Sequence, residues 1–150
     1  MIRLILISIF TLMCCFNAYS ENEPENIVKF RDNLMNLLKY NISSIAQVAK
    51  NEISYTDNLI IYAENIQALL ANADSFFISG TGPNIKGSQA LDKIWNNREE
   101  FRNIFKEASD KAIILTNAVQ SKDINDIGKA VGELGKKCGS CHKKFREKKN

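Results

Sequence analysis

One short stretch near the C-terminus, Cys138-Gly139-Ser140-Cys141-His142, combines two thiols and an imidazole at a spacing that could hold a cofactor. On a helix, Cys138, Cys141 and His142 stand at positions i, i+3 and i+4, so their side chains leave from one face. Cys-x-x-Cys-His is the attachment signature of a c-type haem, in which the thiols form thioethers and the imidazole binds the iron. His142 is also the only histidine of the chain. The motif therefore predicts one haem c, with its iron, per chain.

The residues alone leave three other interpretations of this motif. A Cys-x-x-Cys pair can be a thioredoxin-like redox site, but that site expects a βαβ context, which nothing in the sequence indicates. A zinc site would need a second pair of ligands, and Cys14 and Cys15 lie in a segment that we expect to be removed. A chance occurrence on a lysine-rich helix is the third. The context favours haem attachment, because the first twenty residues also predict an export signal.

The first twenty residues have the composition of a secretory signal peptide. Arg3 supplies the positive start, Leu4 to Phe16 form a mostly apolar run, and Ala18-Tyr19-Ser20 offers small residues before a cleavage site. The run is shorter than the about 20 residues of a membrane span. We therefore predict a signal peptide over 1–20 and a periplasmic haem domain over 21–150, with no stable membrane insertion after cleavage. An uncleaved anchor is the alternative.

Basic residues gather around the motif, although the whole chain is nearly neutral. The formal charge is +3, or +2 without residues 1–20, and this is too small to indicate a nucleic-acid-binding protein. We call the cations that flank the motif the basic collar: Lys136, Lys137, Lys143, Lys144, Arg146, Lys148 and Lys149. The collar is either a solvated helix end that complements the helix dipole, or a surface that steers redox partners with acidic surfaces.

Four long segments repeat apolar residues at spacings of three and four, which is the pattern of amphipathic helices. The first begins near Pro24 and continues to Ala49, and the second spans 59–76. The third starts near Ser88 and continues to Val119, and the fourth follows the N-cap Asp123 and continues to Phe145. No segment alternates with period two, so strands are not needed. We therefore predict an all-α fold, an antiparallel four-helix bundle with covalently attached haem.

Three blocks along the chain together resemble a known family. They are Pro24–Arg31, the segment from Phe76 to Trp95 followed by Phe101, and the C-terminal run Cys138-Gly-Ser-Cys-His142-Lys-Lys-Phe145-Arg146. The last block is similar to the Cys-x-x-Cys-His-x-x-aromatic-Arg pattern of the class II c-type cytochromes, whose best-known members are the cytochromes c′. The first two blocks resemble, in the same order, the family's first helix and its loop and third-helix entry. The resemblance covers essentially the whole mature chain.

The resemblance implies roles for three residues outside the motif. In the family, the residue four after the first-helix arginine faces the iron opposite the histidine, and here Arg31 plus four is Met35. We expect Met35 to be the distal axial ligand, as in low-spin members of the family; a flexible core filler is the alternative. Arg31 resembles the arginine that approaches a haem propionate, and Arg146 resembles the arginine of the proximal pocket. Solvated surface cations are the alternative for both.

The resemblance and the motif together predict a periplasmic one-electron carrier with His142 and Met35 as axial ligands. The alternative is a five-coordinate cytochrome c′ that binds nitric oxide or carbon monoxide, and a helical domain with adventitious cysteines is a third interpretation. The sequence shows no nucleophile–base constellation, phosphate loop or second metal site, so we do not expect an enzyme. We expect redox proteins with acidic surfaces as partners and no nucleic acid. The resemblance also implies a homodimer as an alternative to a monomer.

Overall fold

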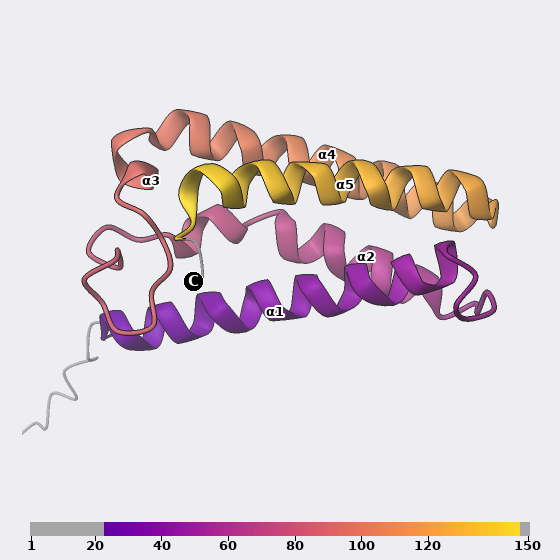
Figure 1. Ribbon diagram of the computed structural model, residues 1–150, viewed down its shortest axis with the longest axis horizontal. Coiled ribbons are helices and arrows are strands. Elements are labelled where there is room, and N and C mark those ends of the chain that lie inside the picture. Colours follow the sequence, from indigo (N-terminus) through magenta and orange to yellow (C-terminus); the bar gives the residue numbers. More distant parts are fainter. Residues whose placement is uncertain (1–22, 148–150) are drawn as a thin grey trace, which may run out of the picture.

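The computed structural model describes residues 23–147, and these form a bundle of four long helices (Figure 1). The long helices are α1 (Pro24–Ala49), α2 (Leu59–Leu70), α4 (Arg98–Ser121) and α5 (Ile124–Phe145). Two short elements lie between α2 and α4: the 3-10 helix η1 (Ala73–Phe76) and the single-turn helix α3 (Lys93–Asn96). The predicted all-α four-helix bundle is confirmed.

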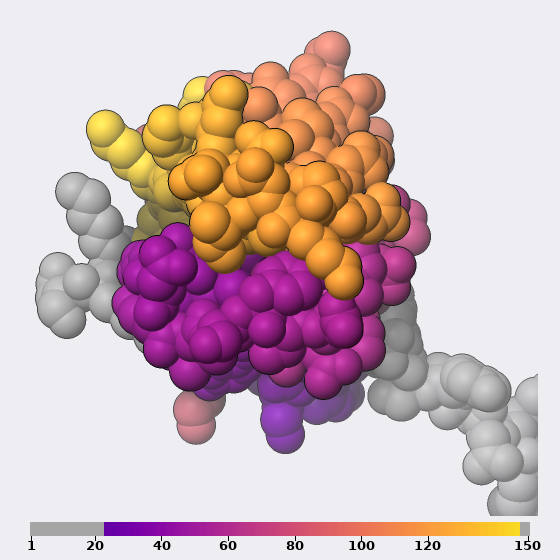
Figure 2. Space-filling model, turned by 90° about the vertical axis from the view of Figure 1, so that its right-hand side faces the viewer, coloured from indigo at the N-terminus to yellow at the C-terminus, as the bar shows by residue number. Residues whose placement is uncertain are grey.

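The four long helices form a closed ring in which each helix packs against two neighbours. Helix α1 packs against α2 and α5, and α4 packs against the same two helices from the other side. The α1–α2 and α4–α5 connections lie at one end of the bundle, and the long connection from η1 to α4 lies at the other (Figure 1). Figure 2 looks onto the first end and shows the α1–α2 pair packed directly beneath the α4–α5 pair. The second end therefore contains the C-terminal half of α5.

Each helix buries its apolar stripe in a common core. The largest side chains with less than 2% exposure come from all four long helices and from α3: Ile45, Leu59, Ile66, Ile94, Phe101, Leu115, Ile127 and Leu134. The start of α5 is fixed locally, as predicted, because Asp123 is its N-cap. The carboxylate oxygen Oδ1 of Asp123 accepts hydrogen bonds from the backbone N–H groups of Asn125 at 2.8 Å and Asp126 at 3.3 Å.

The second helix is shorter than predicted. Helix α2 ends at Leu70, and the chain continues through Asn72 into η1, where the prediction had one helix to Phe76. The hydroxyl of Ser75 donates to the carbonyl oxygen of Asn72 at 2.7 Å. Such a local bond competes with a continuous helical ladder, which explains why the chain tightens into a 3-10 turn here.

The third helix begins later than predicted, because the segment after Ser88 pairs with the chain beyond α5. An isolated antiparallel bridge joins Ala90 to Arg146. The N–H of Leu91 donates to the carbonyl oxygen of Phe145 at 3.0 Å, and the N–H of Glu147 donates to that of Gln89 at 2.8 Å. These backbone groups are used across the molecule, so they cannot form a helical turn.

The backbone then breaks once more between α3 and α4. Asn97 has φ −131° and ψ 49°, which is outside the helical region. The predicted signal peptide over 1–20 lies outside the described residues, and so do Lys148 and Lys149 of the basic collar. Among the helices of residues 23–147, none is long and apolar enough to cross a membrane.

Candidate functional site

A cavity lies at the end of the bundle where α5 ends. Its walls combine α1 (Val28, Arg31, Asp32, Met35), the long connection (Phe77, Gly87, Gln89, Ala90), α3 and α4 (Ile94, Phe101, Phe105), and α5 with the residue after it (Cys141, His142, Phe145, Arg146). The cavity has a volume of about 120 Å³ and is open to solvent.

The cavity brings together predicted residues from both ends of the sequence. Arg31 and Met35 line it from α1, while Cys141, His142 and Arg146 line it from the end of α5. Cys138 lies one turn earlier on α5, partly buried against the hydrophobic core. The structure therefore places all of the predicted site residues at or beside one cavity.

The thiols and the imidazole are partly buried, and this changes their acidity. Cys138 and Cys141 do not form a disulfide bond with each other. Burial raises the pKa of the Cys141 thiol to about 11, and the neighbouring Cys138 adds to the shift. Burial also raises the pKa of Cys138. The pKa of His142 is lowered by burial first and then by the charge of Arg146. The imidazole is therefore neutral at neutral pH, which is the form that binds a metal ion.

Arg31 is a buried cation in the cavity wall, only 5% exposed, so a solvated surface position is wrong for it. Its guanidinium donates to Thr81 Oγ1 at 3.0 Å, to the Thr81 carbonyl oxygen at 3.1 Å and to Ser88 Oγ at 3.0 Å. Its Cζ lies 4.7 Å from the centre of the Phe77 ring. Burial lowers its pKa, and Asp32 opposes that shift, but arginine stays protonated in proteins.

Arg146 differs from Arg31 in its surroundings. It is exposed and lies at the rim of the cavity, where its charge acts on His142. Its backbone is fixed by the bridge to Ala90, whereas Arg31 is fixed through its side chain. The structure therefore places both a solvated and a buried cation beside the cavity.

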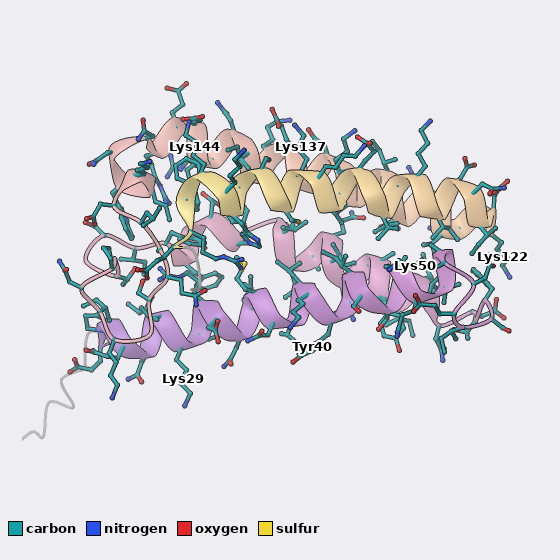
Figure 3. All side chains as sticks on the ribbon, viewed as in Figure 1. Lys29, Tyr40, Lys50, Lys122, Lys137 and Lys144 are labelled. Carbon is teal, nitrogen blue, oxygen red and sulfur yellow. The ribbon has the colours of Figure 1, made fainter. Side chains whose placement is uncertain are left out.

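Three lysines of the basic collar form ion pairs within the molecule. Lys136 pairs with Glu133 and Lys137 pairs with Glu107, each with an N–O distance of 2.6 Å, and Lys144 pairs with Glu100. Figure 3 shows Lys137 and Lys144 beside α4 and α5, on the side away from α1. These pairs are exposed or half-exposed, so each adds little stability. They do reduce the positive field that the sequence alone indicated around the motif.

Sequence reasoning missed the aromatic wall of the cavity. The Phe77 ring centre lies 4.7 Å from that of Phe101 and 5.8 Å from that of Phe105. Phe101 also lies 5.2 Å from Phe145, edge to face. Phe101 and Phe145 stood in the blocks that carry the family resemblance, and Phe105 only in an apolar stripe, but none of the three was predicted to line the site. Two phenylalanines four residues apart on the third segment, close in sequence to the glycine-rich loop, are the signal that could have indicated the wall.

Comparisons with known proteins agree with this geometry. A family model described as Cytochrome C′ matches residues 26–146. The chain belongs to the cytochrome c′ family. Cytochrome c′ from Pararhodospirillum photometricum is 27% identical over 124 residues, which cover 83% of this chain and 98% of the relative. Cytochrome c-556 from Agrobacterium tumefaciens is 30% identical over 126 residues, covering 81% of this chain and 98% of the relative.

A solved structure shows the same fold. The nitric oxide complex of a variant cytochrome c prime from Alcaligenes xylosoxidans superposes with a TM-score of 0.78 at 26% identity, covering 85% of this chain and 98% of that one. Cytochromes c′ are periplasmic c-type haem proteins with electron-transfer or NO/CO-binding roles, and they bind one covalently attached haem c per chain. The predicted cofactor is therefore confirmed.

The residues at the cavity fit a haem. Two thiols and one imidazole stand on α5 at the spacing of the attachment motif, beside a cavity with aromatic walls and a buried cation. The zinc interpretation has no counterpart in residues 23–147, where no group of three His, Cys, Asp or Glu side chains could hold a metal ion. The thioredoxin-like interpretation is wrong, because the motif lies on a helix of a four-helix bundle.

Proposed function

We propose that this cytochrome c′ binds nitric oxide or carbon monoxide at the iron of its haem. Cys138 and Cys141 would hold the haem by thioethers, and His142 would be the axial ligand. When bound, the haem supplies an iron that changes between Fe(II) and Fe(III) and takes up a gas where an axial position is open. The chain has one histidine, so a second imidazole from the same chain does not compete with the gas.

The comparisons support this proposal more than the electron-carrier prediction. Solved structures similar to this chain include two nitric oxide complexes of cytochrome c prime variants, at 25% and 26% identity with TM-scores of 0.77 and 0.78. The cavity supports it as well, because it extends from His142 on α5 to α1 and most of the side chains that line it are apolar. An apolar wall favours a small uncharged ligand over water.

One observation favours a second candidate function. Met35 is partly buried and lines the same cavity as His142, from a different helix. A thioether is a soft ligand that suits haem iron, so Met35 could occupy the position that a gas would take. The protein would then be a low-spin electron carrier, whose ligands change little between the two oxidation states.

The absorption spectrum of the ferrous holoprotein distinguishes the two functions. We expect a high-spin, five-coordinate spectrum that changes on addition of carbon monoxide, and the same spectrum in Met35→Leu. A low-spin spectrum that becomes high-spin in Met35→Leu would instead establish the electron carrier. Asn33→Ala, at an exposed position of the same helix, is the control. A protein without haem after expression with c-type maturation would contradict both functions.

The two arginines have separate proposed roles. Arg31 would give a haem propionate a charge-assisted partner, because the cavity wall holds its buried guanidinium and an acidic group there would neutralise it. Arg146 would shape access to the His142 side from the rim of the cavity. Both roles concern the binding and the electrostatics of the haem rather than catalysis.

We further propose that residues 1–20 direct export and that 21–150 are the mature periplasmic domain. N-terminal sequencing of the exported protein would test the cleavage.

Cytochromes c′ are often dimeric, and a second copy would contact the face where α1 and α2 expose apolar side chains. These are Phe30, Leu37, Tyr40, Ile61 and Tyr62. Sedimentation would show a dimer for the natural chain and a monomer for Leu37→Glu. A monomer for both proteins would contradict the proposed dimer.

A further inference from the structure

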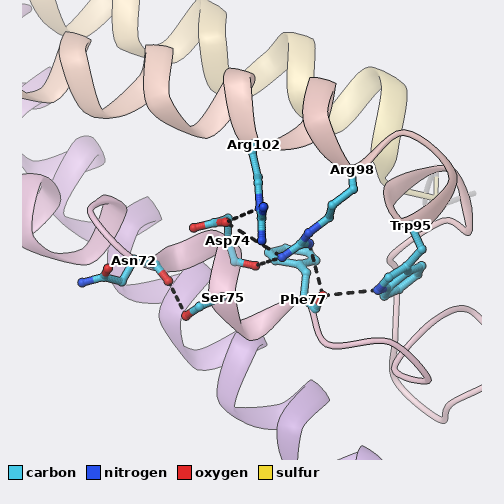
Figure 4. A network of polar contacts seen from close by, with 7 residues as sticks. All are labelled: Asn72, Asp74, Ser75, Phe77, Trp95, Arg98 and Arg102. Carbon is cyan, nitrogen blue, oxygen red and sulfur yellow. Dashed lines mark hydrogen bonds and ion pairs between the residues drawn. The ribbon is translucent and has the colours of Figure 1, made fainter.

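The backbone carbonyl of Phe77 is held by two side chains that lie well outside the motif. Trp95 donates its indole Nε1–H to this oxygen at 3.2 Å, and Arg98 donates from Nη1 at 3.2 Å (Figure 4). Both donors are only partly exposed. One carbonyl oxygen thus uses both of its lone pairs on side chains from α3 and α4.

Arg98 also holds the residues just before Phe77. Its Nη2 donates to the carbonyl oxygen of Asp74 at 3.0 Å and lies 3.9 Å from the Asp74 carboxylate oxygen Oδ2. Arg102, one turn further along α4, contacts only that carboxylate, with its Nε 3.5 Å from Oδ2 (Figure 4). The two arginines therefore differ: Arg98 holds the backbone of η1 and Phe77, and its Cζ lies 5.6 Å from the centre of the Phe101 ring, whereas the more exposed Arg102 contacts only the Asp74 carboxylate.

The ring of Phe77 faces the cavity described above. It lies edge to face with Phe101 at 4.7 Å, and the guanidinium carbon of Arg31 lies 4.7 Å from its centre. Phe77 thus links the two sides of this region. Its carbonyl oxygen accepts hydrogen bonds from Trp95 and Arg98, and its ring contacts the buried guanidinium of Arg31. A shift of the Phe77 backbone would move both an aromatic wall and the surroundings of Arg31, because packed interiors transmit such displacements.

We propose that Trp95 and Arg98 are positioning residues that act through Phe77 to set the reduction potential and gas access of the haem. This inference rests on the proposed function in that it requires the haem to lie in this cavity. Loss of either donor would leave the Phe77 carbonyl with one partner and free its ring to move. The wall beside the haem would then loosen, and the charge of Arg31 would act from a different position.

The test compares Trp95→Phe, Arg98→Gln and the matched control Arg102→Gln as holoproteins. Trp95→Phe keeps an aromatic ring but removes the indole N–H together with the second ring, which packs against Gly82. We expect the first two variants to change the carbon monoxide association rate by at least about threefold. Their midpoint potentials should both shift in the same direction, while Arg102→Gln matches the natural protein in rate and potential. Adding Trp95→Phe to a Phe77→Leu background should change neither quantity further, since the effect acts through that ring.

The outcomes separate this inference from the proposed function. Variants that lower the thermal midpoint but leave rate and potential unchanged would overturn the positioning role, and so would a control that shifts as much as Arg98→Gln. If the natural protein proves low-spin, the midpoint potentials of the same variants, without the carbon monoxide rates, test the positioning role by the same criteria. A natural protein without haem would overturn both the proposed function and this inference.

Discussion

Arg31 carries a positive charge although the residue is only 5% exposed. No carboxylate of residues 23–147 lies within ion-pair distance of it, and its neighbours are two hydroxyls, one carbonyl oxygen and an aromatic face. Burying a charge is costly unless polar contacts compensate for it. Those contacts come from the loop that contains Thr81 and Ser88, so Arg31 fixes that loop to α1 while remaining available to an acidic group in the cavity.

We expect Arg31→Lys to lower the free energy of unfolding by about 1–3 kcal/mol, because a single ammonium cannot reproduce the three hydrogen bonds of the planar guanidinium. Urea unfolding of the holoprotein would measure this change. Arg102→Lys, at an exposed position, should shift the same quantity by less than about 0.5 kcal/mol. Equal effects of the two substitutions would show that the buried bonds do not stabilise the protein.

Local spacing predicted the attachment motif, whereas the roles of Arg31, Met35 and Arg146 came from the resemblance to the cytochromes c′. Met35 follows Arg31 by four positions on a continuous helix, so their shared face could be inferred from the sequence. Thr81 and Phe77 lie in a connection whose path depends on contacts with α1 and α4. No local pattern of the sequence contains those contacts, which is why the partners of Arg31 and the aromatic wall were missed.

At the scale of elements, some helix boundaries follow from neighbouring residues, whereas others are set by contacts between distant parts of the chain. The cap at Asp123 and the proline at the start of α1 were read correctly because capping depends on neighbouring residues only. The predicted start of the third long helix near Ser88 was wrong, because the backbone of Ala90 pairs with that of Arg146. A bridge between segments so far apart in sequence leaves no periodic signal.

Asp123→Ala should lower the free energy of unfolding by about 0.5–2 kcal/mol, because the N–H groups of Asn125 and Asp126 lose their acceptor. Thermal unfolding followed by circular dichroism would measure it. Asn125→Ala, in the same exposed turn, is the control and should change stability much less. The cap would be unimportant if the control were equally destabilising.

Gly132→Ala should raise the stability by about 0.5–1 kcal/mol, because alanine is a better helix former. No heavy atom lies within 4 Å of a Cβ added at Gly132. Gly82→Ala should have the opposite sign, since its Cβ would lie 3.0 Å from Asp92 Oδ1 and 3.1 Å from the Trp95 ring. Urea unfolding of both variants tests the pair, and a destabilised Gly132→Ala would contradict the helix-propensity argument.

On the scale of the whole molecule, an ion pair joins the two connections at the end of the bundle opposite the cavity. Lys122 Nζ lies 2.8 Å from Asp57 Oδ1, and Figure 3 shows Lys122 at that end. The hydrogen bond and the charge of Lys122 lower the pKa of Asp57. Asp57 in turn raises the pKa of Lys122. The pair links the α1–α2 half to the α4–α5 half, so its effect on stability depends on pH.

The lowered pKa of Asp57 fixes the direction of this dependence. Its contribution is present above the usual aspartate pKa of about 3.9 and is lost as the pH falls through the lower value of the folded state. We therefore expect Asp57→Asn to lower the thermal midpoint at pH 7 but not at pH 2, and added salt should reduce the difference. An equal loss at both pH values would show that the effect does not come from the charge.

The pairing of α1 with α5 has a consequence for the order in which the protein assembles. These two helices are the first and last long helices of the described chain, so the ring stays open until α5 docks. Until then the thiols of Cys138 and Cys141 are exposed and can react as ordinary thiols. Once α5 has docked, both are partly buried and their pKa values are raised. A raised pKa leaves less of the reactive thiolate, so we expect thioether formation to be faster on the open chain than on the closed bundle.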